Sequence, residues 1–147
     1  MSEHIRKSHN VTLLLYHIVC PVKYRKKVFT DEVEKTLKDI IEEISVMYEI
    51  NFIEIGTDED HVHFLLQSIP SLSVSRIVTI IKSITAREIF KKHPEVKKML
   101  WKTSFWTSGY YANTVSKFGN KESLVQYIKS QGKEYKSIIS NQIGLFD

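Results

Sequence analysis

The sequence predicts an α+β protein with a ferredoxin-like fold, in which two helices cover one face of an antiparallel sheet. Three observations support this prediction. Apolar, β-branched runs alternate with two longer segments of helical periodicity, in the order β-α-β-β-α-β. The 147 residues suit one compact domain. The hydrophobic fraction of 42% is enough to build a core, which argues against disorder.

The first half of the chain supplies a strand, a helix and a second strand. Residues 11–20 ("VTLLLYHIVC") are mostly apolar and are followed by Pro21, which predicts a buried strand. Residues 31–50 predict a helix that Thr30 or Asp31 can cap. Its apolar positions at helical spacing are Val33, Leu37, Ile40, Ile41, Ile44 and Met47. Residues 51–57 ("NFIEIGT") predict the next strand.

The second half repeats the pattern and adds a helix. After the turn "DED", residues 61–68 ("HVHFLLQS") predict a third strand. A helix is expected from about 74 to 92, capped by Ser71 or Ser73. Its inward positions are expected to be Val74, Ile77, Ile81, Ile84 and Ile89. Residues 104–116 ("SFWTSGYYANTVS") predict a fourth strand bent at Gly109.

A last helix is expected from about 120 to 135, with Asn120 as its N-cap. We therefore expect a single domain over 1–147, with a core over about 11–116 and this C-terminal helix attached to it. The short segment 116–120 ("SKFGN") connects the two parts.

Composition limits the classes of protein only weakly. Lys and Arg total 21 against 17 acidic residues, a small excess that leans toward a polyanionic partner. The basic residues gather in 23–27 and 87–102, although charged runs are most often solvated faces. The single cysteine, Cys20, is interpreted as a small core residue and fits a reducing cytosol. No apolar run approaches the length of a membrane span, and no signal peptide is evident, so we expect a cytoplasmic protein.

The third strand carries two histidines one residue apart, His61 and His63. Side chains alternate along a strand, so both imidazoles face the same side and could ligate one metal ion. The spacing alone is weak, because six histidines produce such a pair by chance in roughly one chain in four of this length. Glu59 and Asp60 could orient a ligand, but we favour turn chemistry as their role. His17 is interpreted as a hydrogen-bonded core histidine, with a role on the sheet face as the alternative.

The last predicted helix carries a second pair of polar residues. Tyr127 and Gln131 are four residues apart and share one helix face. From periodicity alone, the simpler interpretation is a packing tyrosine and a surface amide.

Together, "HVHF", "YIKSQGKEY", "YHIVCPVKYRKKVF" and "SFWTSGYYANTVS" resemble the single-tyrosine HUH transposases of the insertion-sequence-200/605 type. HUH stands for histidine, a bulky hydrophobic residue and histidine. The resemblance extends from about residue 11 to 136. It implies an enzyme that cuts and rejoins single-stranded DNA at the hairpin-marked ends of a mobile element, without ATP. It also implies homodimers in which the tyrosine helix of one subunit completes the active site of the other.

The resemblance assigns roles to particular residues. His61, His63 and Gln131 would bind Mg²⁺ or Mn²⁺, and Tyr127 would attack the scissile phosphate to form a 5′-phosphotyrosine link and release a 3′-hydroxyl. The basic segment after the first strand would contact phosphates, with its tyrosine stacking on a base. The candidates there are Lys23, Tyr24, Arg25, Lys26 and Lys27, with Arg76, Lys82 and Arg87 as weaker candidates on the second helix.

Three other functions fit the sequence less well. The same RRM-like fold occurs in RNA-recognition domains, so a non-catalytic module that binds single-stranded nucleic acid is one alternative. The aromatic residues of 105–111 do not form the paired stacking motif of such domains, which counts against it. The others are a domesticated relative that processes dispersed genomic palindromes, and a nickase that does not rejoin the strand.

Overall fold

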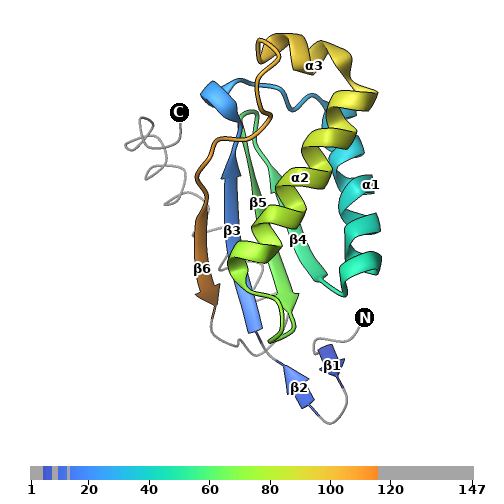
Figure 1. The fold of residues 1–147 in the computed structure, drawn as a ribbon, viewed down its shortest axis with the longest axis vertical. Coiled ribbons are helices and arrows are strands. Elements are labelled where there is room, and N and C mark those ends of the chain that lie inside the picture. Colours follow the sequence, from blue (N-terminus) through green and yellow to red (C-terminus); the bar gives the residue numbers. More distant parts are fainter. Residues whose placement is uncertain (1–4, 8–9, 13, 116–147) are drawn as a thin grey trace.

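The computed structural model describes residues 5–7, 10–12 and 14–115, so the predicted C-terminal helix, with Tyr127 and Gln131, lies outside the described residues. Four strands form one sheet in the order β4-β5-β3-β6, and every neighbouring pair is antiparallel (Figure 1). The strands are β3 (Leu14–Pro21), β4 (Asn51–Thr57), β5 (His61–Ser68) and β6 (Tyr111–Val115). This strand order confirms the ferredoxin-like prediction.

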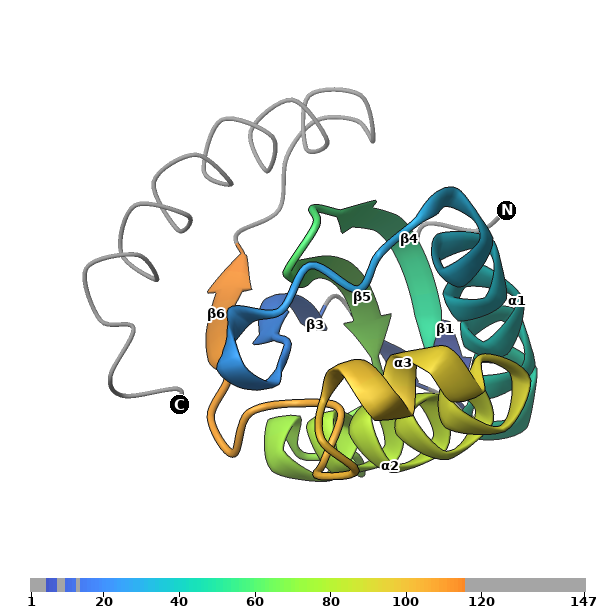
Figure 2. The same ribbon diagram turned by 90° about the horizontal axis from the view of Figure 1, so that it is seen from above.

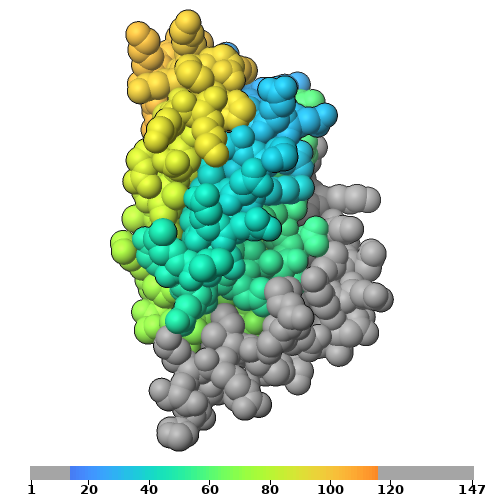
Figure 3. Space-filling model, turned by 90° about the vertical axis from the view of Figure 1, so that its right-hand side faces the viewer, coloured from blue at the N-terminus to red at the C-terminus, as the bar shows by residue number. Residues whose placement is uncertain are grey.

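Two long helices, α1 (Asp31–Tyr48) and α2 (Val74–Lys92), lie side by side over one face of the sheet (Figures 2 and 3). Both begin where the sequence predicts. The Thr30 hydroxyl accepts a hydrogen bond from the Val33 backbone N–H at 3.3 Å, and the Ser73 hydroxyl accepts one from Arg76 at 3.1 Å. These contacts satisfy backbone donors that the first turn of a helix leaves unpaired. No helix in residues 14–115 is long and apolar enough to cross a membrane.

The main core lies between the helices and the sheet. On β5 the alternate residues Val62, Phe64 and Leu66 are fully buried in it, as the sequence predicts. The inward faces of the helices join them, but Met47 does not, because its side chain is 68% exposed one residue before α1 ends. Cys20 is also buried in this core.

The segment predicted as a strand over 104–116 is a strand only from Tyr111 onward. The preceding residues form a loop that closes the end of the core. Phe105 and Trp106 are buried there, and the indole N–H of Trp106 donates to the Thr85 hydroxyl at 2.9 Å. The Lys82 ammonium donates to two carbonyls of this loop, each at 2.8 Å. The aromatic residues therefore fill the core end instead of extending the sheet.

Several short elements were not predicted. β1 (Ile5–Lys7) and β2 (Asn10–Thr12) pair with each other, so residues 11 and 12 do not belong to the first main strand. A single turn of 3-10 helix, η1 (Lys23–Arg25), follows β3, and a short helix, α3 (Pro94–Met99), follows α2. Both η1 and α3 lie at the end of the sheet where β3 finishes and β5 begins (Figure 1).

Candidate functional site

His61 and His63 lie at this end of the sheet, on the face opposite the two helices. His61 is the first residue of β5 and pairs with Pro21, while His63 pairs with Val19 of β3. Because residues 62, 64 and 66 face the helix-covered core, strand alternation places both imidazoles on the other face. His61 is fully buried and His63 is half-buried.

The two imidazoles converge. Their Nε2 atoms lie 3.0 Å apart, with ring centroids at 4.8 Å. Neighbouring ligands of an octahedral ion such as Mg²⁺, each at about 2.1 Å, are themselves about 3.0 Å apart. The spacing therefore fits two ligands of one divalent ion.

A carboxylate holds the other nitrogen of His61. The Nδ1 of His61 lies 2.8 Å from Oδ1 of Asp60. The second carboxylate oxygen of Asp60 accepts a hydrogen bond from Nε of Arg25 at 3.1 Å and forms an ion pair with Nη2 of Arg25 at 3.0 Å. Turn chemistry is therefore not the main role of Asp60, and our preference for it was wrong. Glu59 fits that preference, because its ion pair with Lys27 is exposed on both sides.

A third histidine holds His63. The Nδ1 of His63 lies 3.3 Å from Nε2 of His17, and the two rings are nearly parallel, at 9°. His17 is buried in the middle of β3, on the same sheet face, and burial lowers its pKa to about 4. His17 is thus a buried, hydrogen-bonded histidine, as the favoured interpretation had it, and it also lies on the sheet face beside the pair, where the alternative placed it.

The directions of these hydrogen bonds follow from where the protons lie. A carboxylate accepts only, so Nδ1 of His61 donates to Asp60, and Nε2 of a neutral His61 carries a lone pair. The Nε2–H of a neutral His63 donates to that lone pair, and its Nδ1 accepts from Nε2–H of His17. For both Nε2 atoms to be open to a cation, the proton of His63 would lie on Nδ1 and donate to Nε2 of the other tautomer of His17. Both imidazoles would then be held at Nδ1 and offer Nε2.

The described residues contain no group of three or more His, Cys, Asp or Glu side chains that could hold a metal ion. The two Nε2 atoms fit part of a ligand set, and the predicted third ligand, Gln131, lies outside the described residues together with Tyr127. The structure therefore brings His61 and His63 together and does not test the other two positions.

The predicted DNA-contacting residues separate into different regions. Lys23, Tyr24 and Lys26 lie in and beside η1, at the histidine end of the sheet. Arg25 points inward to Asp60 with only 9% of its side chain exposed, which leaves little of it for a phosphate. The ammonium of Lys82 is occupied by the two loop carbonyls.

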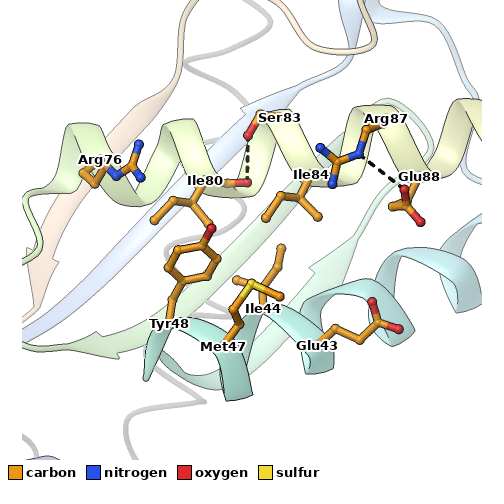
Figure 4. A pocket seen from close by; sticks show the side chains of 10 residues that line it. All are labelled: Glu43, Ile44, Met47, Tyr48, Arg76, Ile80, Ser83, Ile84, Arg87 and Glu88. Carbon is orange, nitrogen blue, oxygen red and sulfur yellow. Dashed lines mark hydrogen bonds and ion pairs between the residues drawn. The ribbon is translucent and has the colours of Figure 1, made fainter.

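Arg76 and Arg87 lie elsewhere. They line a cleft between α1 and α2, together with Met47, Tyr48 and Ile84 (Figure 4). Since both helices cover the face opposite the histidines, this cleft is separated from the site by the sheet. The structure does not bring these two arginines to the histidine pair.

Sequence reasoning raised the present contacts of Asp60 and His17 only as less favoured alternatives, and it missed the contact between Arg25 and Asp60. The signal for Asp60 was its position directly before His61, where a carboxylate can reach Nδ1. Arg25 gave no local signal, since it is 35 residues away from its partner. For His17 the signal was the alternation of side chains along β3, which places His17 on the same face as Val19. Val19 pairs with His63, so His17 lies on the face that carries the two histidines.

Comparisons with known proteins identify the family of this chain. A family model described as "Transposase IS200 like" matches residues 10–131. The chain is 35% identical over 118 residues to the ISDra2 transposase TnpA of Deinococcus radiodurans, covering 80% of this chain and 84% of that protein. It is 31% identical over 121 residues to the transposase for insertion sequence element IS200 of Salmonella typhimurium, covering 82% of this chain and 78% of that protein.

Two solved structures share the fold. One, from D. radiodurans and assigned as a transposase, superposes with a TM-score of 0.69 at 30% identity and covers 86% of this chain and 98% of its own. The other is a REP-associated tyrosine transposase bound to a REP hairpin, with a TM-score of 0.50 at 16% identity, covering 92% and 74%. The second likeness concerns the fold alone. With the family match over residues 10–131 and two relatives above 30% identity, this chain belongs to the IS200-like transposase family.

Proposed function

We propose that this transposase cuts and rejoins single-stranded DNA at the hairpin-marked ends of an insertion sequence, in the prokaryotic cytosol, with Tyr127 as its nucleophile. The observation that carries the proposal is the pair of Nε2 atoms 3.0 Å apart, each on a ring whose Nδ1 is held by a neighbour. Such preorganisation is typical of metal ligands and is not needed for a binding surface.

In this proposal His61, His63 and Gln131 hold Mg²⁺ or Mn²⁺. The bound ion supplies Lewis acidity, which polarises the phosphate oxygens and offsets charge that develops during the reaction. Asp60 keeps the His61 proton on Nδ1, and His17 accepts or donates a proton at Nδ1 of His63. The low pKa of His17 keeps its ring neutral near pH 7, so it adds no positive charge to repel a cation.

The chemical step is a transesterification. The hydroxyl oxygen of Tyr127 forms a bond to the scissile phosphorus and gives up its proton, and the bond from phosphorus to the 3′ oxygen breaks. The 3′ oxygen takes up a proton and leaves as a 3′-hydroxyl, so protons balance over the step. The phosphotyrosine link keeps the energy of the broken bond, so the reverse attack by a 3′-hydroxyl reseals DNA without ATP. A tyrosine hydroxyl has a pKa near 10, so it needs activation at neutral pH.

We further propose that the working unit is a homodimer in which Tyr127 of one subunit meets the histidines of its partner. Segment 116–120 would then direct the tyrosine helix across. A 1:1 mixture of Tyr127→Phe and His63→Ala variants tests this arrangement. Mixed dimers should recover activity if the sites are composite, whereas sites built within one chain would stay inactive in each subunit.

The test of the proposed chemistry is a covalent adduct. Labelled single strands from the two flanks of the gene are incubated with the protein, with and without Mg²⁺, and separated on a denaturing gel. Wild type should give an Mg²⁺-dependent adduct that Tyr127→Phe removes, while the matched control Tyr110→Phe retains it. An undiminished adduct from Tyr127→Phe, or none from wild type, would refute the proposal.

The same assay separates the alternative functions. A binding module would shift the DNA on a native gel without forming an adduct. A nickase would form the adduct but would not join it to an added 3′-hydroxyl strand. A domesticated relative would act on dispersed genomic palindromes in preference to the flanks of its own gene.

A further inference from the structure

Two exposed aromatic side chains meet at the histidine end of the sheet. Tyr24 of η1 is 40% exposed and Trp101, two residues after α3, is 63% exposed. Their rings contact edge to face, with centroids 5.2 Å apart. Exposing most of an indole to water is unfavourable. A contacting pair of exposed Trp and Tyr side chains is therefore typical of a binding site.

Lysine side chains surround the pair. The Lys26 ammonium lies 4.5 Å from the centroid of the Trp101 ring, and the Lys23 ammonium lies 5.4 Å from that of Tyr24. Lys102 follows Trp101 and is exposed. The two basic stretches of the sequence, 23–27 and 87–102, therefore meet at this point. Their charge complements a polyanion rather than an apolar peptide.

The backbone beneath the rings is fixed in a conformation that side chains disfavour. Tyr24 and Arg25 have φ of 59° and 54°, and Trp101 and Lys102 have φ of 51° and 60°. Backbone hydrogen bonds of 2.9 Å from Arg25 to Val22 and of 3.0 Å from Trp101 to Lys98 close the two turns. Neither ring is used to fill the core, so burial of the aromatics does not explain this strain, and strain of this kind gathers at functional sites.

We propose that Trp101, supported by Tyr24, is a stacking platform for one unpaired base of single-stranded DNA, with Lys26 and Lys23 at the flanking phosphates. This inference rests on the proposed function and specifies where the strand is held. Stacking needs no particular base, because every base has a π face. A base on the indole would place its phosphates beside the two ammonium groups, where they can exchange ring contacts for ionic ones.

The platform is joined to the candidate metal ligands. Tyr24 is followed directly by Arg25, whose guanidinium binds Asp60, and Asp60 holds His61. The Val22 N–H also donates to the Asp60 carbonyl at 2.9 Å. The turn that carries Tyr24 is thus tied to the start of β5, so a strand held on Trp101 enters the molecule at the end where the histidines lie.

The inference is tested by binding, which does not require cleavage. A fluorescent 15-nucleotide oligothymidylate is titrated with full-length protein, and anisotropy gives the dissociation constant at several salt concentrations. Trp101→Ala should weaken binding on the order of tenfold, the loss of one stacked base, while Trp101→Phe should recover most of it. The matched control is Met99→Ala, which changes an exposed apolar neighbour of the same turn and should bind like wild type.

The salt dependence separates stacking from charge. Lys26→Gln should lower the slope of log affinity against log salt by about one, whereas Trp101→Ala should leave the slope unchanged. Irradiation of an oligonucleotide containing 5-iodouracil should cross-link the peptide that carries Trp101. Equal affinity of wild type and Trp101→Ala, or cross-links only at other residues, would overturn the inference and favour a protein partner for the patch.

The binding test of the platform can fail or succeed separately from the adduct test of the proposed cleavage. If Trp101→Ala weakens binding but wild type forms no adduct, the platform stands and the proposed cleavage fails. If wild type forms the adduct and Trp101→Ala binds and reacts like wild type, the platform alone fails. An unchanged thermal midpoint of Trp101→Ala is expected, since its ring is mostly exposed, and excludes unfolding as the cause of weak binding.

Discussion

The carboxylate of Asp60 offers the sharpest test of how the site is built. Asp60→Asn keeps the shape of the side chain but removes its negative charge. It also replaces one acceptor oxygen with an NH₂ group, which can only donate. The amide can accept from only one of its present partners, His61 or Arg25. Either the Nδ1–H of a buried imidazole or a guanidinium that is 9% exposed then loses its acceptor.

The structure sets the size of the effect. Breaking a buried ion pair by removing one partner costs about 3–5 kcal/mol. The Asp60 side chain is 20% exposed, so water recovers part of this, and we expect Asp60→Asn to lose about 2 kcal/mol of unfolding free energy. For a chain of this length that lowers the melting temperature by roughly 6 °C. Loss of an outer partner of a metal ligand also weakens metal binding by about 10- to 100-fold.

Both quantities come from one thermal-shift titration with MnCl₂. The midpoint without metal reports stability, and the concentration dependence of its rise reports affinity. Glu59→Gln is the matched control, because its ion pair with Lys27 is exposed on both sides and should change stability by less than about 0.5 kcal/mol. If the two variants respond to Mn²⁺ alike, Asp60 does not position a metal ligand and the reasoning is refuted.

Three further predictions concern the scaffold. Burial raises the pKa of the Cys20 thiol to about 12, so at pH 8.5 iodoacetamide should modify Cys20 only after denaturation, as mass spectrometry would show. Lys82→Met removes the donor to the carbonyls of Thr107 and Gly109 and should lower the unfolding free energy by about 2 kcal/mol in urea titrations; an unchanged midpoint would mean that water replaces the ammonium. Thr30→Ala removes the N-cap of α1 and should lose about 1 kcal/mol, while Thr30→Ser should lose much less; equal losses would contradict a capping role.

The main elements of the fold could be predicted from the sequence because local patterns determine them. The helix starts at Thr30 and Ser73 each combine a capping side chain with an amphipathic run. Strand β5 follows from a period of two, which also placed His61 and His63 on one face. These signals depend only on neighbours within one or two turns, so no knowledge of the tertiary structure was needed.

The prediction of secondary structure and burial failed where tertiary packing determines the conformation. Phe105 and Trp106 have the composition of a strand, but burial at the end of the core favours aromatic residues in a loop just as strongly. Helix α3 has six residues, too few for helical periodicity to stand out. Met47 lies at helical spacing, yet the core ends before it, which only the packing of α1 on the sheet reveals.

The candidate site shows the same division more clearly, because the two histidines are neighbours in sequence while Arg25 and His17 contact the site from far away in sequence. His61 and His63 form a motif within three residues, whereas Arg25 reaches Asp60 across 35 positions and His17 reaches His63 across 46. Such pairs become visible only when β3 is placed antiparallel to β5. Once that pairing is set, each contact has a simple electrostatic reason, and none requires a special sequence pattern.

The turn after β3 carries both Tyr24 of the proposed platform and Arg25, which binds Asp60. Tyr24 and Arg25 are consecutive and both have positive φ, so the same backbone bend turns one side chain outward and the other toward Asp60. A substitution that relaxes this bend would move the proposed base platform and the carboxylate that holds His61 together. Under the proposed function, the position of the bound strand and the orientation of a metal ligand are therefore coupled through one turn. Changes in this turn should alter DNA affinity and metal affinity in the same direction, whereas changes at Trp101 should alter DNA affinity alone.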